Sequence, residues 1–249
     1  MTPTLVPHHP ARDWVEIQER MLVPLYEAVY DRLGLGPGSR VLGLGCGSGL
    51  ALLMAAARGA QVTGVDQDHA RVELARERLP EGSGHTVVRG DPGDAVGLSP
   101  APYDVVTAFH PAAGLGPALA AVTPLAQSGA AVVLAGWGPP ERCATASVLR
   151  VASRLTGWRP ALRDDLEDVV FRSGLRPDGS GRVACPFGYA DPESAVRGLL
   201  STGDFDAAVR ATEPAQVEKE ILEALDPYIR PDGTVWMPNV FRYLIARVP

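Results

Sequence analysis

Residues 41–49 read VLGLGCGSG, an apolar run in which every second residue from Gly43 to Gly49 is glycine, followed at once by a helical pattern. Glycine reaches backbone conformations closed to other residues and lets the backbone approach a ligand closely. A helix that begins directly after such a loop presents its N–H groups to that ligand. The stretch therefore predicts a strand, a glycine-rich turn and a helix N-terminus that together bind a nucleoside.

Strands and helices alternate around this loop. The predicted strands are 40–45, 60–66, 85–91, 103–110 and 130–137, and the predicted helices between them are 48–59, 68–79 and 116–129. Several of these strands are apolar throughout, as in parallel sheets that helices cover on both faces. We therefore predict an α/β fold with a Rossmann-like, doubly wound sheet.

The flanking segments read as additions to this core. A helical pattern over 14–34 is interrupted at Pro24. After Trp137 the sequence predicts helices at 140–156 and 163–173, a strand at 181–187, two or three short helices within 191–229 and a final strand at 234–248. We predict a single domain over 1–249, with a helical cap (1–36), a cofactor-binding core (37–137) and a C-terminal part (138–249) that carries substrate-side helices.

Composition excludes several classes of function. The formal net charge of −6 argues against nucleic-acid binding, which needs clustered Lys and Arg. Cys46, Cys143 and Cys185 have no metal-ligand spacing and are expected to be free thiols in a reducing cytoplasm, so we predict no metal. The start of the chain lacks a signal-peptide pattern, and prolines and glycines interrupt the uncharged stretch from Pro111 to Pro140, so we predict no membrane contact.

An acidic residue follows the glycine loop at the distance that nucleoside sites use. Asp66 ends the second predicted strand, where a carboxylate accepts the ribose hydroxyls. The dinucleotide pattern GxGxxG/A does not fit, because its third small residue would fall on Ser48 or Leu50. A dehydrogenase-like nucleotide site is thus the weaker alternative, and a glycine turn in an unrelated α/β protein is another.

With the GxGxG spacing, Asp66 and the RGD that follows the third strand, residues 37–137 resemble the class I S-adenosylmethionine-dependent methyltransferases. The chain resembles more narrowly the bacterial small-molecule group of the ubiquinone/menaquinone-biosynthesis-like type (methyltransferase type 11). The stretches that carry this likeness are Trp137–Cys143, Pro186–Gly203 and Asp232–Ala246. The resemblance implies a seven-stranded, mostly parallel sheet whose last strand is antiparallel.

The resemblance also implies roles for individual residues toward S-adenosylmethionine. Gly45, Gly47 and Gly49 would face its methionine and ribose moieties, and Gly43 and Cys46 belong to the same loop. Asp66 would take the ribose hydroxyls, Gln67 the adenine edge, and Asp91 the adenine amino group, with Pro92 alongside. Phe109 and His110 would border the path of methyl transfer.

Gly43 departs from the family pattern, which has Asp or Glu at this position near the cationic methionine end of the cofactor. Losing a charge-assisted hydrogen bond of about 1.5–3 kcal/mol weakens binding by roughly tenfold to a hundredfold unless another group compensates. Glu16 and Glu19 of the N-terminal segment could reach over the site. The departure leaves two readings open: a methyltransferase with a shifted contact, or a methyltransferase-like protein that binds S-adenosylmethionine or a metabolite without transferring methyl.

The acceptor side is less defined. His110, after the fourth strand, is the candidate general base for an acceptor that must lose a proton, although a packing role is an alternative. Trp14, Tyr26 and Trp137 are the candidate acceptor-binding residues, and such aromatic side chains favour a small apolar or aromatic metabolite. We expect a monomer or a homodimer, since the uncharged helix at 116–129 lies either under C-terminal segments or at a dimer contact.

Overall fold

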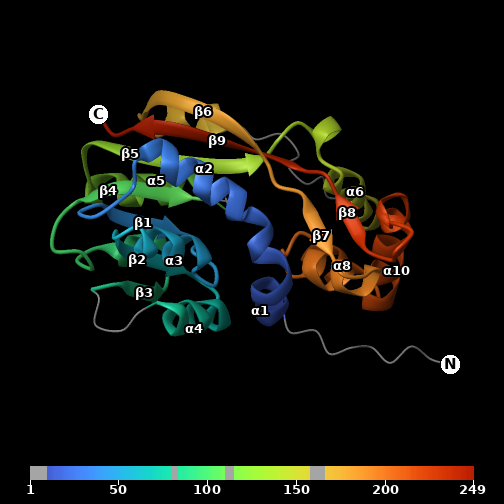
Figure 1. The fold of residues 1–249 in the computed structure, drawn as a ribbon. Helices are drawn as coiled ribbons and strands as arrows, with labels where there is room; N and C mark the ends of the chain where they lie inside the picture. Colours follow the sequence, from blue (N-terminus) through green and yellow to red (C-terminus); the bar gives the residue numbers. More distant parts are fainter. Residues whose placement is uncertain (1–9, 80–83, 110–114, 158–165) are drawn as a thin grey trace. The chain divides into compact units, whose positions relative to one another are not determined.

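The computed structural model describes residues 10–79, 84–109, 115–157 and 166–249 and is drawn in Figure 1. Its described residues form two compact units. The sheet unit comprises the described residues within Leu22–Gly138, Arg163–Ala184 and Val240–Pro249. The helical unit comprises the described residues within Met1–Met21, Pro139–Leu162 and Cys185–Asn239. A single domain with the boundaries given above remains a prediction.

A seven-stranded sheet organises the sheet unit, in the order β3-β2-β1-β4-β5-β9-β6. Its strands are β1 (Arg40–Leu44), β2 (Gln61–Asp66), β3 (Thr86–Arg89), β4 (Tyr103–Ala108), β5 (Ala126–Trp137), β6 (Arg176–Ala184) and β9 (Val240–Arg247). β1 to β5 pair in parallel, whereas β9 is antiparallel to both β5 and β6. The predicted Rossmann-like sheet with an antiparallel last strand is confirmed.

Successive residues of a strand face opposite sides of the sheet, so helices pack on both of its faces. The helices of this unit are α2 (Val23–Leu33), α3 (Leu50–Ala57), α4 (His69–Arg78), α5 (Leu115–Val122) and α7 (Leu166–Arg172), with α3 and α4 seen beside β1 to β3 in Figure 1. Even-numbered strand residues such as Leu42 and Val106 share a core cluster with Leu119 of α5 and Val170 of α7. The odd-numbered positions of β1 face the opposite side.

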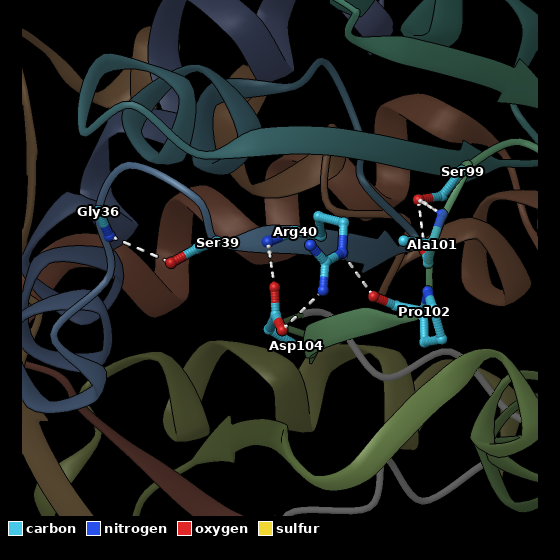
Figure 2. A network of polar contacts seen from close by, with 7 residues as sticks. All are labelled: Gly36, Ser39, Arg40, Ser99, Ala101, Pro102 and Asp104. Carbon is cyan, nitrogen blue, oxygen red and sulfur yellow. Dashed lines mark hydrogen bonds and ion pairs between the residues drawn. The ribbon is translucent and has the colours of Figure 1, made fainter.

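The amino ends of β1 and β4 are joined by one arginine, which Figure 2 shows with its partners. The Arg40 Nε donates to the Pro102 carbonyl at 2.6 Å, and its Nη2 lies 3.1 Å from Asp104 Oδ1. The Arg40 backbone N–H donates to Asp104 Oδ2 at 2.8 Å. This network joins β1 and β4 at their amino ends, the end of the sheet opposite the glycine loop.

The helical unit is built from short elements. They are α1 (Pro10–Asp13), a π-helical turn (Trp14–Gln18), α6 (Thr145–Thr156), α8 (Pro192–Leu200), α9 (Asp206–Ala211) and α10 (Pro214–Leu225), with a two-stranded sheet of β7 (Phe187–Tyr189) and β8 (Val235–Met237). The three helices α8 to α10 confirm the two or three expected within 191–229. Among the helices in the described ranges, none combines the length and apolar content needed to cross a bilayer.

The final strand predicted at 234–248 is wrong as one element. It divides at Pro238 and Asn239 into β8 and β9, which belong to different sheets. Proline cannot donate a ladder hydrogen bond, and the buried Asn239 side chain accepts from the Thr145 N–H at 3.0 Å and donates to the Met237 carbonyl at 3.2 Å. The strand predicted at 181–187 divides likewise, into the end of β6 and the start of β7.

Two predicted boundaries also move. The N-terminal helical pattern breaks after Leu22, and Pro24 lies in the first turn of α2, where its missing N–H is tolerated. The helix predicted at 116–129 ends as an α-helix at Val122 and passes through a 3₁₀ turn that contains Pro124. β5 therefore begins at Ala126 rather than at residue 130.

Candidate functional site

The glycine loop at the carboxyl end of β1 depends on its glycines. Gly45, Gly47 and Gly49 have φ angles of 59°, 56° and 82°, a region that residues with a Cβ rarely adopt. The Cys46 N–H donates to the Val65 carbonyl at 3.1 Å, which ties the loop to β2. α3 begins directly after Gly49, so the loop lies at a helix N-terminus as the sequence predicted.

Asp66, at the end of β2, is hydrogen-bonded to the glycine loop. Its Oδ2 accepts from the Gly47 N–H at 2.8 Å, and its Oδ1 accepts from the Asp68 N–H at 2.9 Å. An ionised carboxylate has about four acceptor positions. Two of them therefore remain for further donors, which suits the two hydroxyls of a ribose. Asp68 in turn caps α4 by accepting from the Arg71 N–H at 3.1 Å, as expected for the helix predicted at 68–79.

Gln67 and Asp91 meet beside Asp66 at the carboxyl ends of β2 and β3. The Gln67 Nε2 donates to Asp91 Oδ1 at 2.5 Å, and the Gln67 carbonyl accepts from Arg89 Nε at 3.2 Å. Asp94 Oδ2 accepts from the Asp91 N–H at 2.8 Å, and Pro92 begins the 3₁₀ turn between them. Gln67 and Asp91 are both exposed, so the predicted adenine-binding residues form one accessible polar edge.

An aromatic cluster lies on the other side of the loop. The Tyr26 and Phe109 ring centroids are 4.8 Å apart, and those of Tyr30 and Phe109 are 5.9 Å apart. The Tyr30 hydroxyl donates to the Ala51 carbonyl of α3 at 2.9 Å. Burial raises the pKa of this hydroxyl far above its usual value, although the nearby Arg58 lowers the pKa in part. The tyrosine therefore stays neutral and fixes α2 against α3.

A small apolar pocket connects the aromatic cluster with the glycine loop. It is lined by Tyr26, Gly43, Leu44, Gly45, Cys46, Ala51, Leu52, Thr107 and Phe109. Its volume of about 10 Å³ matches the space of one water molecule. No charged side chain is among these described lining residues.

Leu52 explains why position 43 carries no side chain. Gly43 pairs with Gly64 across β1 and β2. A Cβ on Gly43 would lie 2.9 Å from Leu52 Cδ2, and a Cβ on Gly64 would lie 2.5 Å from Leu52 Cδ1 and 2.8 Å from Cys46 Sγ. Leu52 is buried and fills the space above both glycines. Sequence reasoning missed Leu52, although two glycines inside strands signal that another group approaches the backbone closely.

The remaining predicted site residues are not among the described residues that line this pocket. Trp137 is half-buried at the end of β5, where its ring centroid lies 4.5 Å from that of Phe241. Trp14 is buried in the π-helical turn of the helical unit, and Glu16 and Glu19 belong to the same unit. His110 lies outside the described residues.

The helical unit has its own buried polar contacts. The Tyr189 hydroxyl donates to Gln18 Oε1 at 2.9 Å, and Arg197 pairs with the buried Asp13. Hydrogen bonding to Asp13 raises the pKa of the Arg197 guanidinium further. Within the described ranges, no three His, Cys, Asp or Glu side chains gather as a metal ion requires.

The family comparison matches this part of the chain. Residues 41–124 match the model of a family described as a methyltransferase domain. The matched segment contains the glycine loop, Asp66, Asp91 and Phe109. This stretch is therefore similar to a methyltransferase domain. No curated protein sequence matches it.

Solved structures with the same fold span nearly the whole chain. An S-adenosylmethionine-dependent methyltransferase from Aquifex aeolicus is 15% identical with a TM-score of 0.56, and the match covers 98% of this chain and 100% of that chain. One from Thiobacillus denitrificans, in complex with S-adenosyl-L-homocysteine, is 20% identical with a TM-score of 0.52 and coverages of 97% and 94%. A geranyl diphosphate C-methyltransferase from Streptomyces coelicolor is 16% identical with a TM-score of 0.52 and coverages of 90% and 75%.

Proposed function

We propose that this protein transfers a methyl group from S-adenosylmethionine to a small apolar or aromatic metabolite. The observation that carries the proposal is the Asp66 carboxylate, which holds the glycine loop through Gly47 and keeps acceptor positions for a ribose. The methyltransferase-domain match over the same residues supports the assignment of the ligand.

Each residue of the cofactor side has a proposed role. Asp66 accepts the ribose hydroxyls, Gln67 contacts the adenine edge, and Asp91 accepts from the adenine amino group, with Pro92 alongside. The loop of Gly43, Gly45, Cys46, Gly47 and Gly49 offers close backbone contact. When bound, the cofactor supplies an activated methyl group, so the chain itself has to align the reactants and exclude water.

The acceptor side is proposed from the aromatic residues near the loop. Tyr26 and Phe109 line the pocket and make its wall apolar, which supports an apolar acceptor. Trp14 and Trp137 are proposed to complete acceptor binding, and His110 to take a proton from acceptors that must lose one. We further propose a cytoplasmic, metal-free bacterial protein, monomeric or homodimeric, that binds neither nucleic acid nor membrane.

Titration calorimetry with S-adenosylhomocysteine tests the cofactor side. We expect binding by the full chain and a roughly tenfold to hundredfold loss in an Asp66→Asn variant, since a hydrogen bond to a charged group contributes about 1.5–3 kcal/mol. Asp31→Asn is the matched control, because Asp31 is exposed on α2 and its carboxylate pairs with Arg58. Equal affinities in the wild type and Asp66→Asn would reject the assigned role.

Methyl transfer itself needs an acceptor screen that follows formation of S-adenosylhomocysteine. Turnover with an apolar or aromatic compound is the expected result. Cofactor binding without turnover on any acceptor would favour a methyltransferase-like binder instead. Full turnover by a His110→Ala variant would remove this histidine from the mechanism.

A further inference from the structure

The pocket beside the glycine loop differs from the nucleoside edge in its chemistry. At the nucleoside edge, Asp66, Gln67 and Asp91 supply carboxylate and amide groups. At the pocket, the described lining is backbone, thiol, hydroxyl, aliphatic and aromatic groups, with Leu52 and Phe109 among the buried side chains. A ligand that spans both would have one polar half and one half facing an apolar wall.

Leu52 keeps a charged side chain out of position 43 by steric overlap. Its Cδ2 stands 2.9 Å from the position of a Cβ on Gly43, so a carboxylate there requires the leucine to move. Its Cδ1 occupies the space above Gly64, the residue paired with Gly43, which leaves no equivalent place on the neighbouring strand. The acidic side chain that the family pattern has at position 43 is thus replaced by the packed Leu52 side chain and not by an empty space.

An ammonium group finds no carboxylate partner among the described residues that line this wall. Bringing a charge beside apolar groups without a partner is costly, so the ammonium of an amino-acid moiety is favoured only where it stays in water. Binding free energy then has to come from the adenosine half.

We propose that this site recognises its ligand by the adenosine half and is nearly indifferent to the amino-acid end, with Leu52 as the residue that sets this selectivity. The inference rests on the proposed function, since it concerns the same S-adenosylmethionine site. It predicts that adenosine thioethers without an amino-acid group compete well with those that carry one.

The test compares two thioethers by titration calorimetry with the full chain. S-Adenosylhomocysteine carries the amino-acid end, and 5′-methylthioadenosine lacks it. We expect dissociation constants within about fivefold of each other, because one ionic contact would separate them by roughly tenfold or more. A preference of about tenfold or more for S-adenosylhomocysteine would overturn the inference and leave the proposed function intact. Binding of neither ligand would reject the proposed function and the inference with it.

Variants at positions 43 and 52 test whether Leu52 sets this selectivity between the two thioethers. Gly43→Asp/Leu52→Ala restores a carboxylate and removes the group that blocks it, so it should bind S-adenosylhomocysteine about tenfold tighter and 5′-methylthioadenosine unchanged. Gly43→Asp alone should show no such gain. Gly116→Asp is the charge control, because a Cβ at Gly116 on α5 meets nothing within 4 Å. Thermal unfolding checks that each variant is folded, and Leu52→Ala serves as the folded reference for the double variant.

Three outcomes would overturn the role of Leu52. They are a full gain with Gly43→Asp alone, a gain of similar size for both ligands, and a folded double variant with no gain. Selective tightening toward S-adenosylhomocysteine in the double variant alone would support it.

Discussion

Replacing Gly49 with alanine tests whether close packing of α3 on α4 dictates the glycine loop. Gly49 has φ 82° and ψ 11°, and a Cβ there would lie 2.9 Å from Ala75 Cβ and 3.1 Å from Ala75 Cα. Ala75 is fully buried in α4 and has no flexible end that could swing away. The substitution therefore meets both an unfavourable backbone conformation and a steric overlap.

The two costs can be separated with a matched glycine. Gly34 follows α2 with φ 61° and ψ 38°, and a Cβ there meets nothing within 4 Å. Gly34→Ala should lower the free energy of unfolding by about 1–2 kcal/mol through the left-handed backbone alone. Gly49→Ala adds an overpacking cost of about 1–3 kcal/mol, so its total should be roughly 2–5 kcal/mol.

Urea unfolding of the full chain, followed by circular dichroism, measures both variants. An unchanged slope against urea is needed for the free energies to be comparable. Adding Ala75→Gly to Gly49→Ala should recover part of the loss, because it removes the nearer contact. If Gly49→Ala costs no more than Gly34→Ala, the packing argument is refuted.

Two further predictions concern the rest of the molecule. Arg40→Met should lower the free energy of unfolding by about 1–2 kcal/mol, since it breaks a partly exposed charge-assisted network with Asp104 at the far edge of the sheet. Its affinity for S-adenosylhomocysteine should stay at the wild-type value in calorimetry, and a weaker affinity would contradict the separation of this edge from the site. Burial raises the pKa of Asp204 to about 6, with the Thr202 hydroxyl lowering it in part. A carboxyl whose folded pKa is raised favours folding below its unfolded pKa and loses that advantage as the pH rises through 6. Asp204→Asn should therefore gain stability over the wild type as the pH of thermal unfolding goes from 4 to 7, and a constant difference would refute the shift.

The sequence was sufficient for the order of the core elements and for the meeting of Gln67 and Asp91 beside Asp66. Alternating apolar strands and helices predict a parallel sheet from local periodicity alone, and the carboxyl ends of its strands meet at one edge. Asp66 ends β2 and Asp91 follows the neighbouring strand β3, so their approach follows from topology. The positive φ angles of Gly45, Gly47 and Gly49 likewise confirm what the spacing indicated.

Other features depended on contacts between segments far apart in the sequence. The final strand divides at Pro238 because Asn239 bonds to the N–H of Thr145, a partner that no local pattern reveals. β5 begins early at Ala126 because that residue pairs with Tyr103 of β4. Hydrogen bonds to distant backbone here override the local preference that placed the boundary later.

Within the site, Gly43 shows the same difference between what the sequence determines and what the tertiary structure determines. The sequence by itself determined that the acid of the family pattern is absent. Only the tertiary structure decided that the Leu52 side chain stands in its place. This depends on which side of β1 faces α3 and on the position of Leu52 above Gly43 and its paired residue Gly64. Local periodicity determines which residues can form a strand or helix, whereas side-chain volume between paired elements determines what each position can hold.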